Sequence, residues 1–232
     1  MLQVRRSAER GYFDHGWLKS YHTFSFADYH DPDWIAYGPL RVINDDRVAP
    51  GQGFGKHGHR DMEILTYILE GELEHQDSMG NGSIIRVGDV QRMSAGLGVT
   101  HSEFNPSDKQ EVHLLQIWIH PEVTRLAPGY EQKHFAAADK RGRLRLIASR
   151  AGEDGAVVIH QDARVYAGLF DGAERADFPV SAGRRAWVQV ARGALAVDGT
   201  RLQAGDGGRT AGPAQLALRD GAQAEVLVFD LP

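Results

Sequence analysis

Short apolar runs separated by glycine, aspartate and asparagine recur along the whole chain and constrain its fold more than any other feature. The runs are rich in valine, isoleucine, leucine and aromatic residues, which is typical of short antiparallel strands. Helical periodicity is hard to find, and a short turn near Ala136–Lys140 is the best helical candidate. We therefore predict an all-β fold, a sandwich or a barrel. The clearest expected strands are Leu40–Ile43, Glu63–Leu69, Ser83–Val87, Val112–Ile119, Leu144–Ile147, Val157–Gln161, Ala186–Val190 and Val226–Phe229.

Two distant segments share one order of turn signals, which indicates an internal duplication. In each segment a glycine follows a strand, a Gly-Asp pair comes next, and an apolar strand closes the series. The matching signals are Gly71 with Gly193 and Gly88-Asp89 with Gly205-Asp206. We predict two barrel domains, residues 1–128 and 129–232, because the segment around Pro128 suits an extended connection.

Composition excludes several classes of partner and site. The formal net charge is -5 and no long run of lysine or arginine occurs, so we expect neither nucleic acid nor an anionic membrane as a partner. The chain has no cysteine, which excludes disulfides and zinc–thiolate sites. The N-terminal segment lacks the apolar core of a secretory signal, and no stretch approaches the roughly 18 apolar residues of a membrane span. A cytoplasmic location is the expectation.

Four residues form two candidate ligand pairs. His57 and His59 are spaced at i and i+2, and so are His101 and Glu103. Side chains with this spacing project from the same face of a strand. Two such strands facing each other would supply three nitrogens and one oxygen, a set that suits a divalent first-row metal such as Fe(II), Mn, Ni, Cu or Zn with open positions for water or substrate.

The second half of the duplication has lost this ligand pattern. When the repeated glycines are aligned without gaps, Pro179 and Ser181 stand opposite His57 and His59. No histidine occurs after His160. We therefore predict one metal site, in the first half.

Two further residues near the expected site remain open. The strand Glu63–Leu69 is largely apolar on both faces and should be central in its sheet. Glu63 at its start is either a partner that orients a ligand histidine or a strand-end residue in water. His113 is either a pocket residue or a hydrogen-bonded wall residue. The aromatic stretch from His22 to Tyr37 either covers the barrel mouth or belongs to the core.

The residues from Gly51 to Asn105 resemble the two motifs of the cupin superfamily, with H-x-H at His57 and a later His101. The match departs from the cupin pattern at Ser94, where cupins usually have proline, and in two spacings. With those departures the sequence resembles the pirin family, and the resemblance is strong over about the first 120 residues. The segments that carry it are Tyr21–Phe26, His57–Glu63, Gln91–Gly96 and Thr100–Glu103.

The resemblance implies a bicupin in which only the N-terminal barrel binds metal. It implies His57, His59, His101 and Glu103 as the ligands, with Glu103 rather than Glu63 as the carboxylate, and Fe(II) as the ion. Zn, Mn, Ni, Co and Cu are the other candidates. Bacterial members of this length suggest a quercetin dioxygenase that opens a flavonol ring with O2, in which Glu103 also accepts the proton of the flavonol 3-hydroxyl.

Two alternatives to this activity stay open at this point. One is a metal-bearing, redox-sensitive regulatory protein without catalysis of its own, which would bind a protein partner. The sequence has no linear partner motif that supports it. The other is a non-redox cupin enzyme such as an isomerase, which would work with zinc and need no oxygen.

Overall fold

Strands dominate the computed structural model, which describes all residues from 1 to 232. About 60% of the residues lie in strands and 4% in helices, so the prediction of an all-β fold is confirmed. The expected strand Val112–Ile119 coincides with β11, and the short helix α1 covers Ala137–Lys140. No helix is long and apolar enough to span a bilayer. The cytoplasmic location stays a prediction.

The chain divides into two compact units, which we call the first and the second barrel. The first barrel comprises residues 11–134 and 157–161, and the second comprises residues 1–10, 135–156 and 162–232. The strands of the first barrel are β2 (Gly11–Asp14), β3 (Leu18–His22), β4 (Leu40–Val48), β5 (Gly53–His59), β6 (Glu63–Glu70), β7 (Glu72–Asp77), β8 (Gly82–Arg86), β9 (Asp89–Ser94), β10 (Val99–Phe104), β11, β12 (Gly129–His134) and β14 (Val157–Val158).

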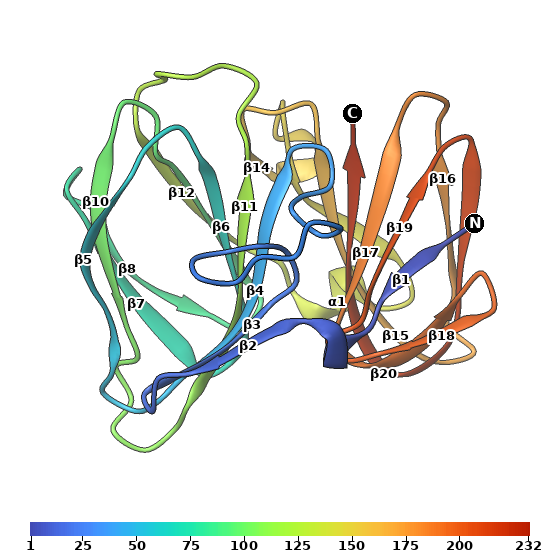
Figure 1. Cartoon of the computed structure of the whole chain (residues 1–232), viewed down its shortest axis with the longest axis horizontal. Helices are drawn as coiled ribbons and strands as arrows, with labels where there is room; N and C mark the ends of the chain where they lie inside the picture. The colour runs from blue at the N-terminus through green and yellow to red at the C-terminus, as the bar shows by residue number, and fades with distance from the viewer. The chain divides into compact units, whose positions relative to one another are not determined.

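Two antiparallel sheets build the first barrel (Figure 1). One has the strand order β5-β10-β7-β8, and the other has the order β12-β9-β6-β11-β4-β3-β2. As predicted, β6 is central in its sheet, between β9 and β11. An apolar cluster that includes Ile68, Leu73 and Leu114 lies inside the barrel, and each of these residues is almost fully buried. Burial of this kind is the main source of stability.

The second barrel contains the longest strands of the chain. Its main sheet has the order β1-β19-β17-β20-β15-β13, with β16 paired to β20 and β18 paired to β17. Its core cluster includes Val188, Leu195 and Val226. Its elements are β1 (Gln3–Arg5), η1 (Ser7–Glu9), α1, β13 (Leu144–Ser149), η2 (Glu153–Gly155), β15 (Arg164–Gly172), β16 (Ala176–Val180), β17 (Arg185–Val197), β18 (Thr200–Gln203), β19 (Gly207–Ala211) and β20 (Ala214–Leu231).

The repeated turn signals have the same structural role in both barrels. Asp89 Oδ2 accepts a hydrogen bond from the backbone N–H of Arg86 at 2.9 Å, and Asp206 Oδ2 accepts one from the backbone N–H of Gln203 at 3.1 Å. Each aspartate therefore closes the turn that precedes it, in the manner of short polar side chains that bond to nearby backbone. The similarity explains why the Gly-Asp pair recurs.

The first residues of the chain belong to the second barrel, which the sequence does not reveal. Val4 of β1 pairs with Gly208 of β19, and the backbone N–H of Ser7 donates to Asp206 Oδ1 at 2.7 Å. After Pro128, β12 still pairs with β9 of the first barrel. The division into domains at residue 128 stays a prediction.

A repeated glycine allows a prediction about stability. Gly193 has φ +61, and a Cβ atom there would lie 2.3 Å from the carbonyl oxygen of Ala222, whereas Gly199 has φ +75 with open space around it. Gly199→Ala therefore introduces only left-handed strain, about 1–2 kcal/mol. We expect Gly193→Ala to lower the free energy of unfolding clearly further in chemical denaturation. Equal losses in the two variants would contradict the close contact.

Candidate metal centre

The four predicted ligands lie on two neighbouring strands. β5 and β10 pair antiparallel, and His101 is the register partner of His57. The two strands are thus side by side in one sheet, rather than facing each other as predicted. Gly53 permits this approach, because a Cβ atom there would lie 2.2 Å from the carbonyl oxygen of Glu103. A register shift follows His101 and offsets Glu103 against β5.

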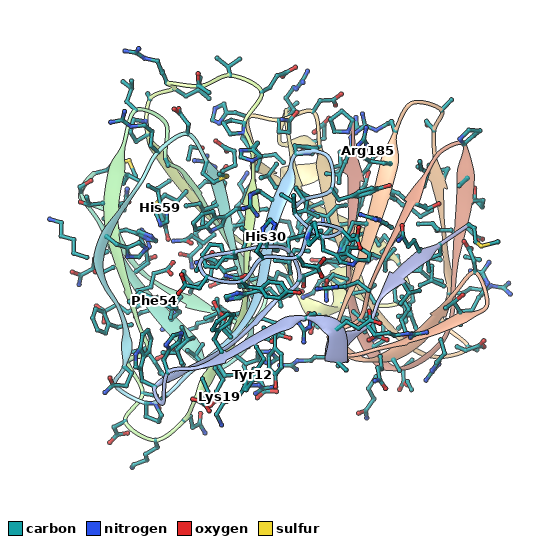
Figure 2. The ribbon with its side chains drawn as sticks, in the orientation of Figure 1. Tyr12, Lys19, His30, Phe54, His59 and Arg185 are labelled. Atoms are coloured by element: carbon teal, nitrogen blue, oxygen red, sulfur yellow. The ribbon has the colours of Figure 1, made fainter.

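The three imidazoles form a compact cluster. The ring centroids are 4.4 Å apart for His57 and His101, 4.8 Å for His57 and His59, and 4.9 Å for His59 and His101. One nitrogen from each ring lies within 4.8 Å of the others. His57 Nδ1 donates to the carbonyl oxygen of Gly55 at 2.8 Å, because a carbonyl can only accept. This bond leaves His57 Nε2 with a free lone pair, as a metal ligand requires. Figure 2 labels His59 on β5.

Glu103 lies beside this cluster and is almost fully buried. Its Oε1 is 3.8 Å from His101 Nδ1, and its Oε2 accepts a hydrogen bond from Gln116 Nε2 at 3.1 Å. Glu103 Oε1 and His101 Nε2 are both buried without a hydrogen-bond partner. Buried polar atoms without partners are costly, and a divalent cation would satisfy both. The residues present therefore fit a divalent metal.

The protonation states also suit a metal. Burial and, to a smaller extent, the neighbouring His57 lower the pKa of His59 to about 4, against the opposing charge of Glu103. Burial likewise lowers the pKa of His101 to about 4, although the charge of Glu103 opposes this effect. For Glu103, burial raises the pKa, but the interactions with His75 and His101 outweigh it and leave the pKa below its ordinary value. At neutral pH these groups are two neutral imidazoles and a carboxylate, which are the forms that bind metals.

His75 is a neighbour of the site that the sequence analysis missed. It is fully buried on β7, with Nδ1 3.5 Å from His101 Nδ1 and 3.9 Å from Glu103 Oε1. Its Nε2 contacts Asp77 Oδ2 at 3.4 Å. Two sets of atoms could therefore hold a metal: the first set is His57, His59 and His101, and the second set is His75, His101 and Glu103. The spacing of Leu73, His75 and Asp77 along one strand face was the available signal.

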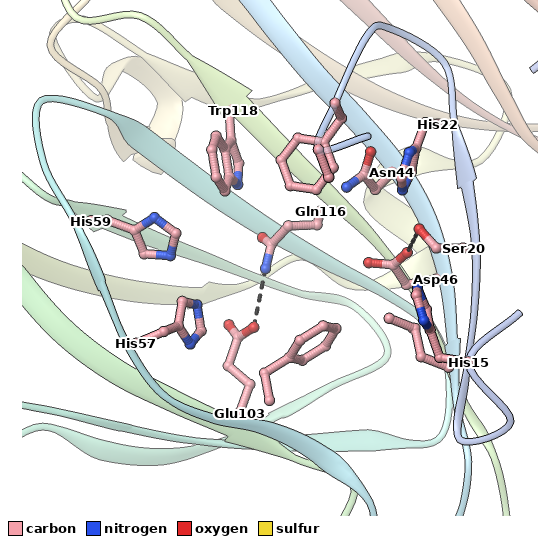
Figure 3. A pocket seen from close by; sticks show the side chains of 14 residues that line it. His15, Ser20, His22, Asn44, Asp46, His57, His59, Glu103, Gln116 and Trp118 are labelled. Carbon is pink, nitrogen blue, oxygen red and sulfur yellow. Dashed lines mark hydrogen bonds between the residues drawn. The ribbon is translucent and has the colours of Figure 1, made fainter. Parts of the chain in front are cut away.

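The site opens onto a pocket with a volume of about 320 Å³ (Figure 3), within the range of small-molecule sites. His57, His59 and Glu103 line one side of it. Trp118 packs edge-on against His59, with 5.0 Å between ring centroids. The remaining lining residues are His15, Leu18, Ser20, His22, Phe26, Ala27, Asn44, Asp46, Phe54 and Gln116.

A polar group lies on the other side of the pocket from the histidine cluster (Figure 3). Ser20 and His22 of β3 are the register partners of Asp46 and Asn44 of β4. Ser20 Oγ donates to Asp46 Oδ1. Burial raises the pKa of Asp46 to about 7, and the hydrogen bond from Ser20 reduces the rise. Asp46 thus keeps its proton in mildly acidic solution.

The other residues considered in the sequence have structural roles. Glu63 is buried; it accepts hydrogen bonds from Ser94 Oγ at 2.8 Å and from the backbone N–H of His160 at 3.3 Å. It is therefore neither in water nor a partner of a ligand histidine. His113 Nε2 contacts Asp45 Oδ1 at 2.7 Å, as expected of a wall residue. In the aromatic stretch, Phe24 is buried in the core, whereas Phe26 lines the pocket.

Comparison with known proteins decides the family. The pirin family model matches residues 2–119, and a model described as the quercetinase C-terminal cupin domain matches residues 146–231. The chain is 45% identical over 232 residues to quercetin 2,3-dioxygenase of Escherichia coli, covering 100% of the chain and 99% of the relative. The chain belongs to the pirin family. Its two barrels are those of a pirin bicupin, as the resemblance implied.

Solved pirin structures support the same conclusion. The crystal structure of YhhW from Escherichia coli has a TM-score of 0.96 at 45% identity and covers 100% of this chain and 98% of its own. The complex of this bacterial pirin with nickel(II) has a TM-score of 0.95 at 44% identity and covers 100% and 99%. Together with the His/Glu cluster, the nickel complex makes a divalent metal the expected cofactor class of this pirin.

Substitution of single histidines distinguishes the two sets of ligand atoms. His59 belongs only to the first set and His75 only to the second. If the metal binds at the first set, His59→Ala loses stoichiometric metal after loading and desalting, while His75→Gln retains it. His30→Ala, on the exposed side chain labelled in Figure 2, is the control. The opposite pattern, with metal retained in His59→Ala and lost in His75→Gln, would assign the metal to the second set.

Asp46 predicts a pH-dependent stability. Its pKa is raised from 3.8 to about 7, so the folded state holds the proton more tightly than the unfolded state. The resulting stabilisation is present below pH 4 and is lost as the pH rises to about 7. As the pH rises from 4 to 8, the free energy of unfolding of metal-free Asp46→Asn should increase relative to that of the metal-free wild type. We expect the increase to be on the order of a few kcal/mol. Exposed Asp108→Asn is the control, and a pH-independent difference for Asp46→Asn would contradict the assignment.

Proposed function

We propose that this pirin is a metal-dependent dioxygenase that opens the ring of a flavonol such as quercetin with O2. The observation that carries the proposal is the cluster of His57, His59 and His101, with Glu103 Oε1 3.8 Å from His101 Nδ1, beside an aromatic-lined pocket. The name of the Escherichia coli relative, quercetin 2,3-dioxygenase, supports the same reaction. Flavonol and O2 are then the small-molecule partners.

We propose His57, His59, His101 and Glu103 as the ligands and Fe(II) as the ion. The accessibility of the first set favours it over the set with His75. His57 and His59 line the pocket, whereas His75 is fully buried and does not line it, and a catalytic site must leave a position for substrate. When bound, such a metal polarises a coordinated oxygen and, if redox-active, engages dioxygen.

Glu103 is proposed as the base for the flavonol 3-hydroxyl. Its lowered pKa keeps it ionised at neutral pH, and its Oε1 has no hydrogen-bond partner. Gln116 holds the other oxygen, Oε2, so that Oε1, as the atom of a labile ligand, is the one that would receive the proton. A base must lie within hydrogen-bond reach of the proton it takes, and Glu103 lines the same pocket as His57 and His59.

The pocket walls would orient the substrate and exclude water. Phe26 packs edge-on against Trp118, with 5.2 Å between ring centroids, and Phe54 packs edge-on against Trp17 at the same distance. Phe26, Phe54 and Trp118 line the pocket. Flat aromatic side chains suit the planar rings of a flavonol, and a dry wall strengthens the electrostatic interactions of the reacting groups.

Oxygen uptake with quercetin tests the proposal. We expect Fe(II)-loaded protein to deplete quercetin absorbance and to consume one O2 per quercetin, with both atoms of ¹⁸O2 recovered in the product. Glu103→Gln should lower kcat by about 10²–10⁴ if the carboxylate is the base. The matched control is Glu111→Gln, on an exposed carboxylate paired with Arg47.

Three outcomes would contradict the proposal in different ways. If the Fe(II)-loaded protein neither depletes quercetin nor consumes oxygen, the dioxygenase is excluded. Capture of one protein partner in the ferric state alone, without turnover, would favour the regulatory alternative. Activity that persists with zinc under strict anaerobiosis would indicate a non-redox cupin enzyme.

A further inference from the structure

The polar group across the pocket from the metal ligands has no role in the reaction described so far. It consists of Ser20, His22, Asn44 and Asp46, which come from two adjacent strands in matched register. Residues two apart on a strand share a face, and all four line the pocket. In Figure 3 they lie on one side, His57 and His59 lie on the other, and Gln116 and Trp118 lie between.

Asn44 is the residue of this polar group whose side chain most clearly indicates a ligand. Its side chain is 5% exposed, and its Oδ1 is buried without a hydrogen-bond partner. Leaving a buried carbonyl oxygen without a hydrogen bond costs about 1–3 kcal/mol. Such an oxygen is therefore expected chiefly where a bound group supplies the missing hydrogen bond. The missing partner must be a donor, such as a hydroxyl group.

Asp46 extends this polar surface. One of its oxygens accepts the hydroxyl of Ser20, and its raised pKa keeps the group protonated in mildly acidic solution. A neutral carboxyl can donate and accept hydrogen bonds at once. It therefore suits a hydroxyl group, which can likewise donate and accept.

We propose that Asn44 and Asp46 form a subsite that binds a phenolic hydroxyl on the substrate ring distal to the metal ligands. This inference rests on the proposed function, because it places the chelating oxygens of the substrate at the metal that His57 and His59 would hold. It adds a specificity: the pocket prefers substrates whose distal ring is hydroxylated. Buried sites built for a hydroxyl discriminate against analogues that lack it, because their polar atoms are then left unpaired.

Flavonols with the same chelating end and different distal rings test the subsite. Quercetin carries two hydroxyls on that ring, kaempferol one and galangin none. We expect zinc-loaded wild-type protein under nitrogen to bind quercetin about tenfold more tightly than galangin, the free energy of roughly one hydrogen bond. Kaempferol should lie between them. The dissociation constants follow from the flavonol absorbance change.

Asn44→Leu removes the unpaired oxygen and keeps the branched shape and the number of side-chain heavy atoms. We expect this variant to bind quercetin about tenfold more weakly than the wild type and to leave galangin unchanged, so that the preference disappears. Gln110→Leu, at an exposed position, should retain the preference. The proposal is overturned if the wild type shows no preference, if Asn44→Leu retains it, or if both affinities fall together.

A measurement on unaltered protein guards against a variant that fails to fold. The side-chain amide resonance of Asn44 should shift further when quercetin binds than when galangin binds; equal shifts would contradict the subsite. Failure of the dioxygenase proposal is distinguishable, because binding preference is measured without oxygen. A binding preference for quercetin without turnover would contradict only the proposed reaction. Turnover without a binding preference would contradict only the subsite.

Discussion

The pairing of β5 with β10 is the interaction on which the site depends. It places His57 beside His101 in one register and brings three imidazoles within 5 Å of each other, measured between ring centroids. A slip of one residue would turn these side chains to the opposite face of the sheet. Gly53 permits the pairing, since no larger residue fits against the backbone of Glu103.

The second sheet completes the pocket with a different chemistry. β11 contributes Gln116 and Trp118, and β4 contributes Asn44 and Asp46. Gln116 is the register partner of Asn44 and donates to Glu103, so one side chain connects the two sides of the pocket. The metal side therefore carries imidazoles and a carboxylate, while the far side carries an amide and a carboxyl group with a raised pKa. Such an arrangement would fix both ends of an elongated, planar substrate.

Much of this organisation could be predicted from the sequence, because it depends on local patterns. Strand alternation and turn residues gave the all-β fold, and the spacing of His57, His59, His101 and Glu103 gave the cluster. Those signals are short-range: two residues on one strand face, or a glycine that a turn requires.

The parts that were missed depend on contacts between distant segments. His75 joins the cluster only because β7 pairs with β10, and Asn44 and Asp46 face the pocket only because of how β4 lies in its sheet. The membership of β1 in the second barrel likewise results from pairing with β19, some 200 residues away. The spacing of residues along the chain does not predict which distant strands pair.

The most direct test of the account is the position of the metal in a crystal structure of the loaded protein, located by its anomalous scattering. We predict one strong peak per chain, in the first barrel, about 2.0–2.2 Å from a nitrogen of His57, His59 and His101 and from an oxygen of Glu103. A peak bonded to His75, or a peak in the second barrel alone, would contradict it.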